Sequence, residues 1–125
     1  ALKILNNYLS GTALAATTEA MLYGLSQGLD MKTMLDVVNV STGRNTATEE
    51  KFPNRVLTGT FKGGFATALL AKDINLFLEN AHAAGTPTTI ADTVGAVWND
   101  TDETLPGSDI MAIYLLKRDG KVEGY

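Results

Sequence analysis

A long helical pattern at the start of the chain constrains its fold more than any other feature. Apolar residues recur at steps of three and four from Ala1 to about Gly28, a stretch without proline. The stripe consists of Leu5, Leu9, Ala13, Ala16 and Ala20. This spacing is typical of one α-helical face, and about 25 residues of helix span roughly 38 Å. We expect the stripe to be buried and most of the helix circumference to be enclosed.

The segment that follows has the signals of two shorter helices. Asp30 is placed to cap a helix from Met31 to about Asn39. A brief helix is expected to begin at Thr46 or Thr48 and to run through Lys51, because Pro53 cannot continue it.

Three further amphipathic patterns occupy the second half of the chain. Thr67 is expected to cap a helix to about Ala84, Thr88 or Thr89 to open another, and Ser108 to cap a last one through about Lys117. The residues expected to face inward are Leu69, Leu70, Ile74, Phe77, Leu78, Ala81, Ile90, Val94, Val97 and Trp98. The sequence therefore predicts an all-α single domain of about six helices around one long N-terminal helix.

Composition excludes several functional classes. The 125 residues include 14 acidic and 10 basic side chains, for a net charge of −4, and they contain no cysteine. A negative chain without basic runs is a poor nucleic-acid binder, and without cysteine it has no disulfide framework. No apolar run approaches the roughly 20 residues of a membrane-spanning helix, and no signal-peptide pattern opens the chain. We expect a cytoplasmic protein with neither nucleic acid nor membrane as a partner.

Two groups of polar residues are candidates for chemistry. Lys3 and Asn7 are four residues apart and therefore share one face of the first helix. A lysine there can exchange a proton with a substrate oxygen, and the amide can hold that oxygen in place. The ordinary alternative is a solvated lysine beside a surface asparagine. Lys72 and Asp73 lie inside the Thr67 helix, where the ordinary alternative is a surface ion pair of little energetic value.

Other signals are weaker. Gly63 and Gly64 precede a helix but lack the lysine spacing of a phosphate-binding loop. His82 is the single histidine, and no second imidazole or carboxylate stands at metal-ligand spacing, so we expect no metal site.

Motifs spread over nearly the whole chain resemble one enzyme family. They are Lys3-Ile4-Leu5-Asn6-Asn7, Thr18-Glu19-Ala20-Met21, Gly28-Leu29-Asp30, Ser41-Thr42-Gly43-Arg44, Gly63-Gly64-Phe65, Leu70-Ala71-Lys72-Asp73-Ile74 and Gly107-Ser108-Asp109. In this order they resemble the helical C-terminal domain of the β-hydroxyacid dehydrogenases, with the fold of the 6-phosphogluconate dehydrogenase C-terminal domain. Within that group the chain is similar to the branch that includes 3-hydroxyisobutyrate dehydrogenase and tartronate semialdehyde reductase.

The resemblance implies a role for each candidate residue. Lys3 is expected to be the catalytic acid/base, and Asn7 to orient the substrate. Lys72 is expected to contact the cofactor, NAD or NADP, with Phe65 and Asp73 lining the same cleft. Asn6 argues against the 6-phosphogluconate branch, which has histidine at that position, and Lys3 argues against the imine reductases, which lack this lysine.

The chain lacks the other half of such an enzyme. A Gly-x-Gly-x-x-Gly motif is absent from the sequence. We therefore expect residues 1–125 to be a helical catalytic and dimerisation domain whose partners are its own dinucleotide-binding domain, a small hydroxy acid or its semialdehyde, and a second copy in a dimer or tetramer. The isolated chain is expected to be inactive. The alternatives are a helical dimerisation module without chemistry and an unrelated regulatory or phosphate-binding bundle.

Overall fold

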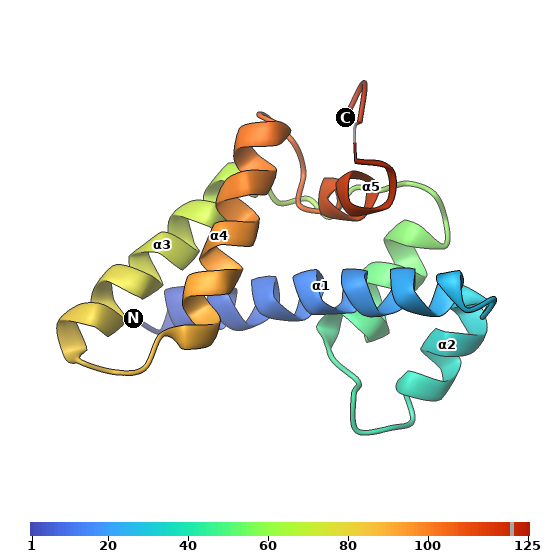
Figure 1. Ribbon diagram of the computed structural model, residues 1–125, viewed down its shortest axis with the longest axis horizontal. Helices are drawn as coiled ribbons and strands as arrows, with labels where there is room; N and C mark the ends of the chain where they lie inside the picture. Colours follow the sequence, from blue (N-terminus) through green and yellow to red (C-terminus); the bar gives the residue numbers. More distant parts are fainter. Residues whose placement is uncertain (121) are drawn as a thin grey trace.

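The protein is built around one long helix. The computed structural model describes residues 1–120 and 122–125, and its first helix, α1, covers Leu2–Ser26. In Figure 1, α3 and α4 lie side by side across the N-terminal half of α1, while α2 lies at its C-terminal end and α5 above its middle. The remaining elements are α2 (Met31–Val38), the π-helix η1 (Ala47–Val56), α3 (Thr67–Ala84), α4 (Thr89–Thr104) and α5 (Ala112–Asp119).

This arrangement confirms the predicted all-α class. The described residues form six helices and no strand; a single isolated bridge joins Ala66 to Asp109. Asp30 caps α2 as expected, because its carboxylate accepts a hydrogen bond from the Thr33 amide at 3.1 Å. Gly85 ends α3 in the left-handed conformation, at φ 72°. Among residues 1–120 and 122–125, no helix has the length and apolar character needed to cross a membrane.

The predicted caps of α3 and α5 are wrong. Thr67 is the first residue of α3 rather than its cap, and Ala66 occupies the cap position. Ser108 lies four residues before α5 begins, and its buried hydroxyl donates a hydrogen bond to the Thr67 hydroxyl at 2.8 Å. The two side chains therefore tie the starts of α3 and α5 together, a long-range role that local sequence does not reveal.

Pro53 does not end the third helix, contrary to expectation. η1 continues through it to Val56 as a π-helix, in which each amide pairs with the carbonyl five residues earlier. Proline has no amide proton, so the carbonyl that loses its partner is that of Thr48. Asn39 supplies the missing donor: its Nδ2 lies 2.7 Å from the Thr48 oxygen.

The buried face of α1 is also not the predicted one. Leu5 and Leu9 of the expected stripe are 44% and 58% exposed, and Ala16 and Ala20 are exposed as well. The core-facing residues are Gly11, Leu14, Thr17, Thr18, Met21 and Gly24. Two predicted inward residues on other helices, Leu69 and Ile90, are exposed too. Small residues let the other helices approach one side of α1, and its apolar stripe faces outward.

Where α1, α3 and α4 cross, the core is tightly packed. Trp98 is fully buried, and its indole nitrogen donates to the Gly11 carbonyl at 3.0 Å. Ile74 is fully buried against the same glycine, and a Cβ added at Gly11 would lie 2.9 Å from its Cδ1 atom. This packing fixes α3 against α1 and so places the middle of α3 beside the first two turns of α1.

Candidate active site

A buried carboxylate joins the predicted acid/base residues. Asp73, on the face of α3 that meets α1, is 5% exposed. Its Oδ2 atom accepts a hydrogen bond from Asn7 Nδ2 at 2.7 Å. The same oxygen lies 3.6 Å from the Lys3 ammonium nitrogen. The structure therefore brings Lys3, Asn7 and Asp73 into one cluster, as the spacing of the first two residues allowed.

The cluster is open on one side. The Lys3 side chain is 77% exposed, whereas that of Asp73 is 7% exposed. Asn7 is half-buried, and its Oδ1 atom accepts a hydrogen bond from Asn6 Nδ2 at 3.3 Å. Within residues 1–120 and 122–125, the Lys3 ammonium therefore lies at the surface rather than in an enclosed crevice.

Lys72 lies beside Asp73 in sequence but belongs to a different surface. Its side chain is exposed and lines a polar groove of about 320 Å³ between α3 and α4. Asn75 and Asn99 cross this groove, each amide donating to the other at 2.9 and 3.1 Å. Among the side chains that the structure describes, no hydrogen bond or ion pair links Lys72 to Lys3 or Asn7.

Phe65 is held by a carboxylate that the sequence analysis did not identify as part of a site. Asp109 accepts hydrogen bonds from the Gly63 amide at 2.8 Å, the Phe65 amide at 3.2 Å and the Met111 amide at 2.9 Å. The Phe65 carbonyl in turn accepts from the Ile110 amide at 2.9 Å. Asp109 therefore fixes the loop that leads into α3. Its loop partners stand 44 and 46 residues away, so no local signal could have found them.

His82 has a local role. Its Nε2 atom lies 3.0 Å from the Thr88 hydroxyl and 3.6 Å from Asp92 Oδ1, near the start of α4. Both partners follow His82 closely in the sequence, and the three side chains connect the end of α3 to the start of α4. His82 therefore has a structural role.

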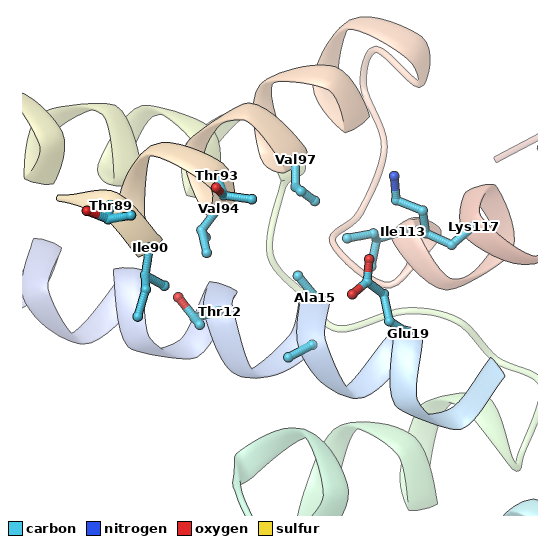
Figure 2. Close-up of a pocket in the computed structure, with 11 residues that line it drawn as sticks. Thr12, Ala15, Glu19, Thr89, Ile90, Thr93, Val94, Val97, Ile113 and Lys117 are labelled. Carbon is cyan, nitrogen blue, oxygen red and sulfur yellow. The ribbon is translucent and has the colours of Figure 1, made fainter. Parts of the chain in front are cut away.

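A second groove, not predicted from the sequence, lies among α1, α4 and α5. It has a volume of about 400 Å³ and a largely apolar lining that includes Ala15, Val97 and Ile113. Figure 2 shows Glu19 and Lys117 at the same end of this groove. Its lining shares no residue with the Lys3 cluster.

Comparisons with known proteins identify the class to which this domain belongs. Residues 1–116 match the family model described as the NAD-binding domain of NADP-dependent 3-hydroxyisobutyrate dehydrogenase. The structure of Mycobacterium tuberculosis 3-hydroxyisobutyrate dehydrogenase with L-serine superposes with a TM-score of 0.84, at 24% identity over 94% of this chain and 42% of that one. The latter comparison shows that the two share the helical fold.

Two curated relatives support the same assignment. The chain is 39% identical to 2-(hydroxymethyl)glutarate dehydrogenase of Eubacterium barkeri over 70% of its length, and 36% identical to mitochondrial 3-hydroxyisobutyrate dehydrogenase of Rattus norvegicus over 68%. It spans 29% and 27% of the length of these two relatives. The chain therefore belongs to the 3-hydroxyisobutyrate dehydrogenase family, within the β-hydroxyacid dehydrogenases, and corresponds to their helical C-terminal domain.

Proposed function

We propose that this chain supplies the acid/base side of an NAD(P)-dependent dehydrogenase that interconverts a short 3-hydroxy acid and its semialdehyde or keto form. The observation that carries the proposal is the cluster at the start of α1. There the Lys3 ammonium and the Asn7 amide lie on one helical face and meet the same Asp73 oxygen. The open side of this cluster is where a substrate and a second domain would complete the site.

The proposed chemistry needs one proton to move at the substrate oxygen. NAD(P), when bound, accepts or donates the hydride at the carbinol carbon. In the reductive direction, Lys3 as the ammonium stabilises the developing alkoxide and then protonates it. In the oxidative direction, the neutral amine accepts the hydroxyl proton as the hydride leaves the carbon. Asn7 donates its second amide N–H to the same substrate oxygen and so holds it within reach of Lys3.

We propose that the groove at Lys72 receives part of the nicotinamide nucleotide. The Lys72 ammonium can donate to a ribose hydroxyl or to the carboxamide oxygen. Glu79 and Asp102 also line the groove, and their negative charges disfavour a pyrophosphate there. We therefore assign Lys72 to the nucleoside end of the cofactor, with Phe65 placed by its loop at the start of α3. The phosphates are left to a dinucleotide-binding domain outside these 125 residues.

The names of the relatives support a substrate class. Both 3-hydroxyisobutyrate and 2-(hydroxymethyl)glutarate contain a hydroxymethyl group on the carbon that bears a carboxylate. A substrate with this unit presents a primary alcohol for oxidation and a carboxylate for recognition. We propose that the substrate of this enzyme has the same unit. The rat relative is mitochondrial by name, while the expected cytoplasmic location of this protein stays a prediction.

An assay of the complete enzyme tests the function. The enzyme, with this chain joined to its dinucleotide-binding domain, is incubated with NAD or NADP and a panel of 2-substituted 3-hydroxypropanoates. We expect reduction of the cofactor with at least one member, and none with the 125-residue chain alone. Turnover by the isolated chain would contradict the proposal that a second domain binds the cofactor. Inactivity of the complete enzyme toward every compound in the panel would contradict the substrate class.

The exposed apolar side chains favour a second candidate function, that of a dimerisation module. Near the C-terminal end of α1, an apolar groove of about 380 Å³ is bordered by Tyr23, Leu29 and Val37, all three of which are exposed. This end lies roughly 30 Å along α1 from Lys3, at about 1.5 Å per residue. A dinucleotide-binding domain seated at the Lys3 end would leave the groove uncovered, so we propose that a second copy of the chain covers it.

Light scattering tests the dimer. We expect the chain to have the mass of a dimer or a higher oligomer at micromolar concentration, and Val37→Glu to shift it toward the monomer because a charge enters the apolar groove. Lys62→Glu, on the exposed loop before α3, is the control and should leave the mass unchanged. A wild-type chain that stays monomeric at high concentration would refute the dimer.

A further inference from the structure

We propose that Asp73 is a positioning residue, which acts on the reaction through Lys3 and Asn7 rather than through the cofactor. This inference rests on the proposed function and deepens it. The resemblance implied a place for Asp73 in the cofactor cleft beside Lys72. In the structure, however, the two neighbouring side chains diverge: Lys72 lines the groove between α3 and α4, and Asp73 contacts α1.

The burial of Asp73 requires partners that compensate for the water its carboxylate has lost. A buried carboxylate is costly unless hydrogen bonds or opposite charges compensate for the lost water. Leu70 and Ile74, on the same face of α3, are both buried in the core. The side-chain partners that the structure gives Asp73 are Asn7 and Lys3, both from α1. The cost of burying the carboxylate is therefore offset mainly by the Asn7 hydrogen bond, and the Lys3 charge lies 3.6 Å away at the surface.

The hydrogen bond also determines which way the Asn7 amide points. An ionised carboxylate can only accept, so the nitrogen of the amide must face Asp73 at 2.7 Å. One of its two N–H bonds is thereby used, and the second remains for a substrate oxygen. The Oδ1 atom is turned toward Asn6. Without the carboxylate, the amide could rotate and present its oxygen, which would repel a substrate alkoxide.

Lys3 is restrained in a different way. Its long side chain is 77% exposed, and an ion pair with such an exposed partner contributes little to stability. The 3.6 Å contact does limit where the ammonium can go, because it tethers the end of a flexible side chain above Asp73 Oδ2. Since that oxygen also binds Asn7, the ammonium and the amide are both drawn toward one carboxylate oxygen, and so toward one place for a substrate oxygen.

Kinetics of the complete enzyme test the proposal. Asp73→Asn should lower kcat roughly 10- to 100-fold, as expected for a misplaced catalytic group, and leave the Kd for NAD(P)H within about twofold. Asp73→Glu, which restores the charge, should recover part of the loss. The control is Asp36→Asn, which breaks an exposed pair with Lys32 at 2.9 Å and should change neither value. A Kd raised roughly tenfold with kcat unchanged at saturating cofactor, or no effect on either, would overturn the proposal.

Two further measurements separate this proposal from the proposed function. If Lys3→Ala abolishes turnover but Asp73→Asn leaves kcat intact, the positioning role fails while the acid/base assignment stands. If Lys3→Ala retains turnover, the proposed function fails. Should Asp73→Asn not fold, Asp73→Glu supplies the answer, because it keeps the charge and moves the carboxylate relative to Asn7 and Lys3. A kcat below that of wild type with an unchanged Kd for NAD(P)H supports the positioning role, and an unchanged kcat would overturn the proposal.

Discussion

The contact between Gly11 and Ile74 gives a quantitative test of the helix crossing that places α3 beside the cluster. A Cβ at Gly11 would lie 2.9 Å from Ile74 Cδ1 and 3.1 Å from Trp98 Nε1. Overpacking of this kind costs about 1–3 kcal/mol, while alanine in a helix gains about 1 kcal/mol over glycine. We therefore expect Gly11→Ala to lower the free energy of unfolding by about 1 kcal/mol.

A second substitution removes the closer of the two contacts. Ile74→Val deletes the Cδ1 atom and alone costs about 0.5–1.5 kcal/mol. In the double variant the methyl group added by Gly11→Ala takes the place of that atom, so the stability should lie within about 0.5 kcal/mol of wild type. Simple addition of the two single effects would predict a loss of about 2 kcal/mol.

Urea unfolding followed by circular dichroism measures this coupling. The matched control is Gly95→Ala, because its Cβ would lie 2.7 Å from Leu78 Cδ1 and 3.7 Å from Ile74 Cγ2, an atom that valine retains. Gly95→Ala and Ile74→Val should therefore add to within about 0.5 kcal/mol. Equal additivity in both pairs would refute the packing described for the α1–α3 crossing.

Two further substitutions test the structure elsewhere. Burial raises the pKa of the Tyr114 hydroxyl above its ordinary value of 10.0, so folding favours the neutral phenol; this stabilisation is complete below pH 10.0 and is lost as the pH rises through the folded-state pKa. Tyr114→Phe should consequently weaken the loss of stability above pH 10.0 in urea titrations, and an unchanged alkaline limb would contradict it. Asp109→Ala leaves the Gly63 and Phe65 amides without their acceptor, so we expect thermal unfolding to show a loss of about 2–4 kcal/mol. A loss below about 0.5 kcal/mol, typical of an ordinary surface position, would contradict that role.

Local signals predicted the helices well. The Asp30 cap and the end of α3 at Ala84 each depend on a few neighbouring residues, and both are confirmed. Pro53 was misleading because the π-helix spacing and a side chain nine residues before Thr48 together accommodate it. Contacts between residues far apart in the sequence also explain the wrong caps, since the Thr67 and Ser108 side chains form a hydrogen bond with each other across 41 residues.

The buried face of α1 could not be read from hydrophobicity. Residues such as Gly11 and Thr18 are buried because neighbouring helices approach closely there, whereas Leu5 and Leu9 face outward. Hydrophobicity alone does not distinguish a helix face that is buried inside the domain from one that another domain or another copy covers. For the site, the spacing of Lys3 and Asn7 correctly predicted a shared face. Their connection through Asp73 spans 66 residues from Asn7 and required the fold.

The central claim is that Lys3 donates a proton to the substrate oxygen, or accepts one from it, as hydride is transferred. The most direct measurement compares wild type and Lys3→Ala in the complete enzyme, following cofactor reduction and NAD(P)H binding in parallel. We predict that turnover is abolished in Lys3→Ala while the Kd for NAD(P)H is largely preserved, because the lysine acts on the substrate oxygen. Turnover that survives the substitution at a rate near that of wild type would contradict the account.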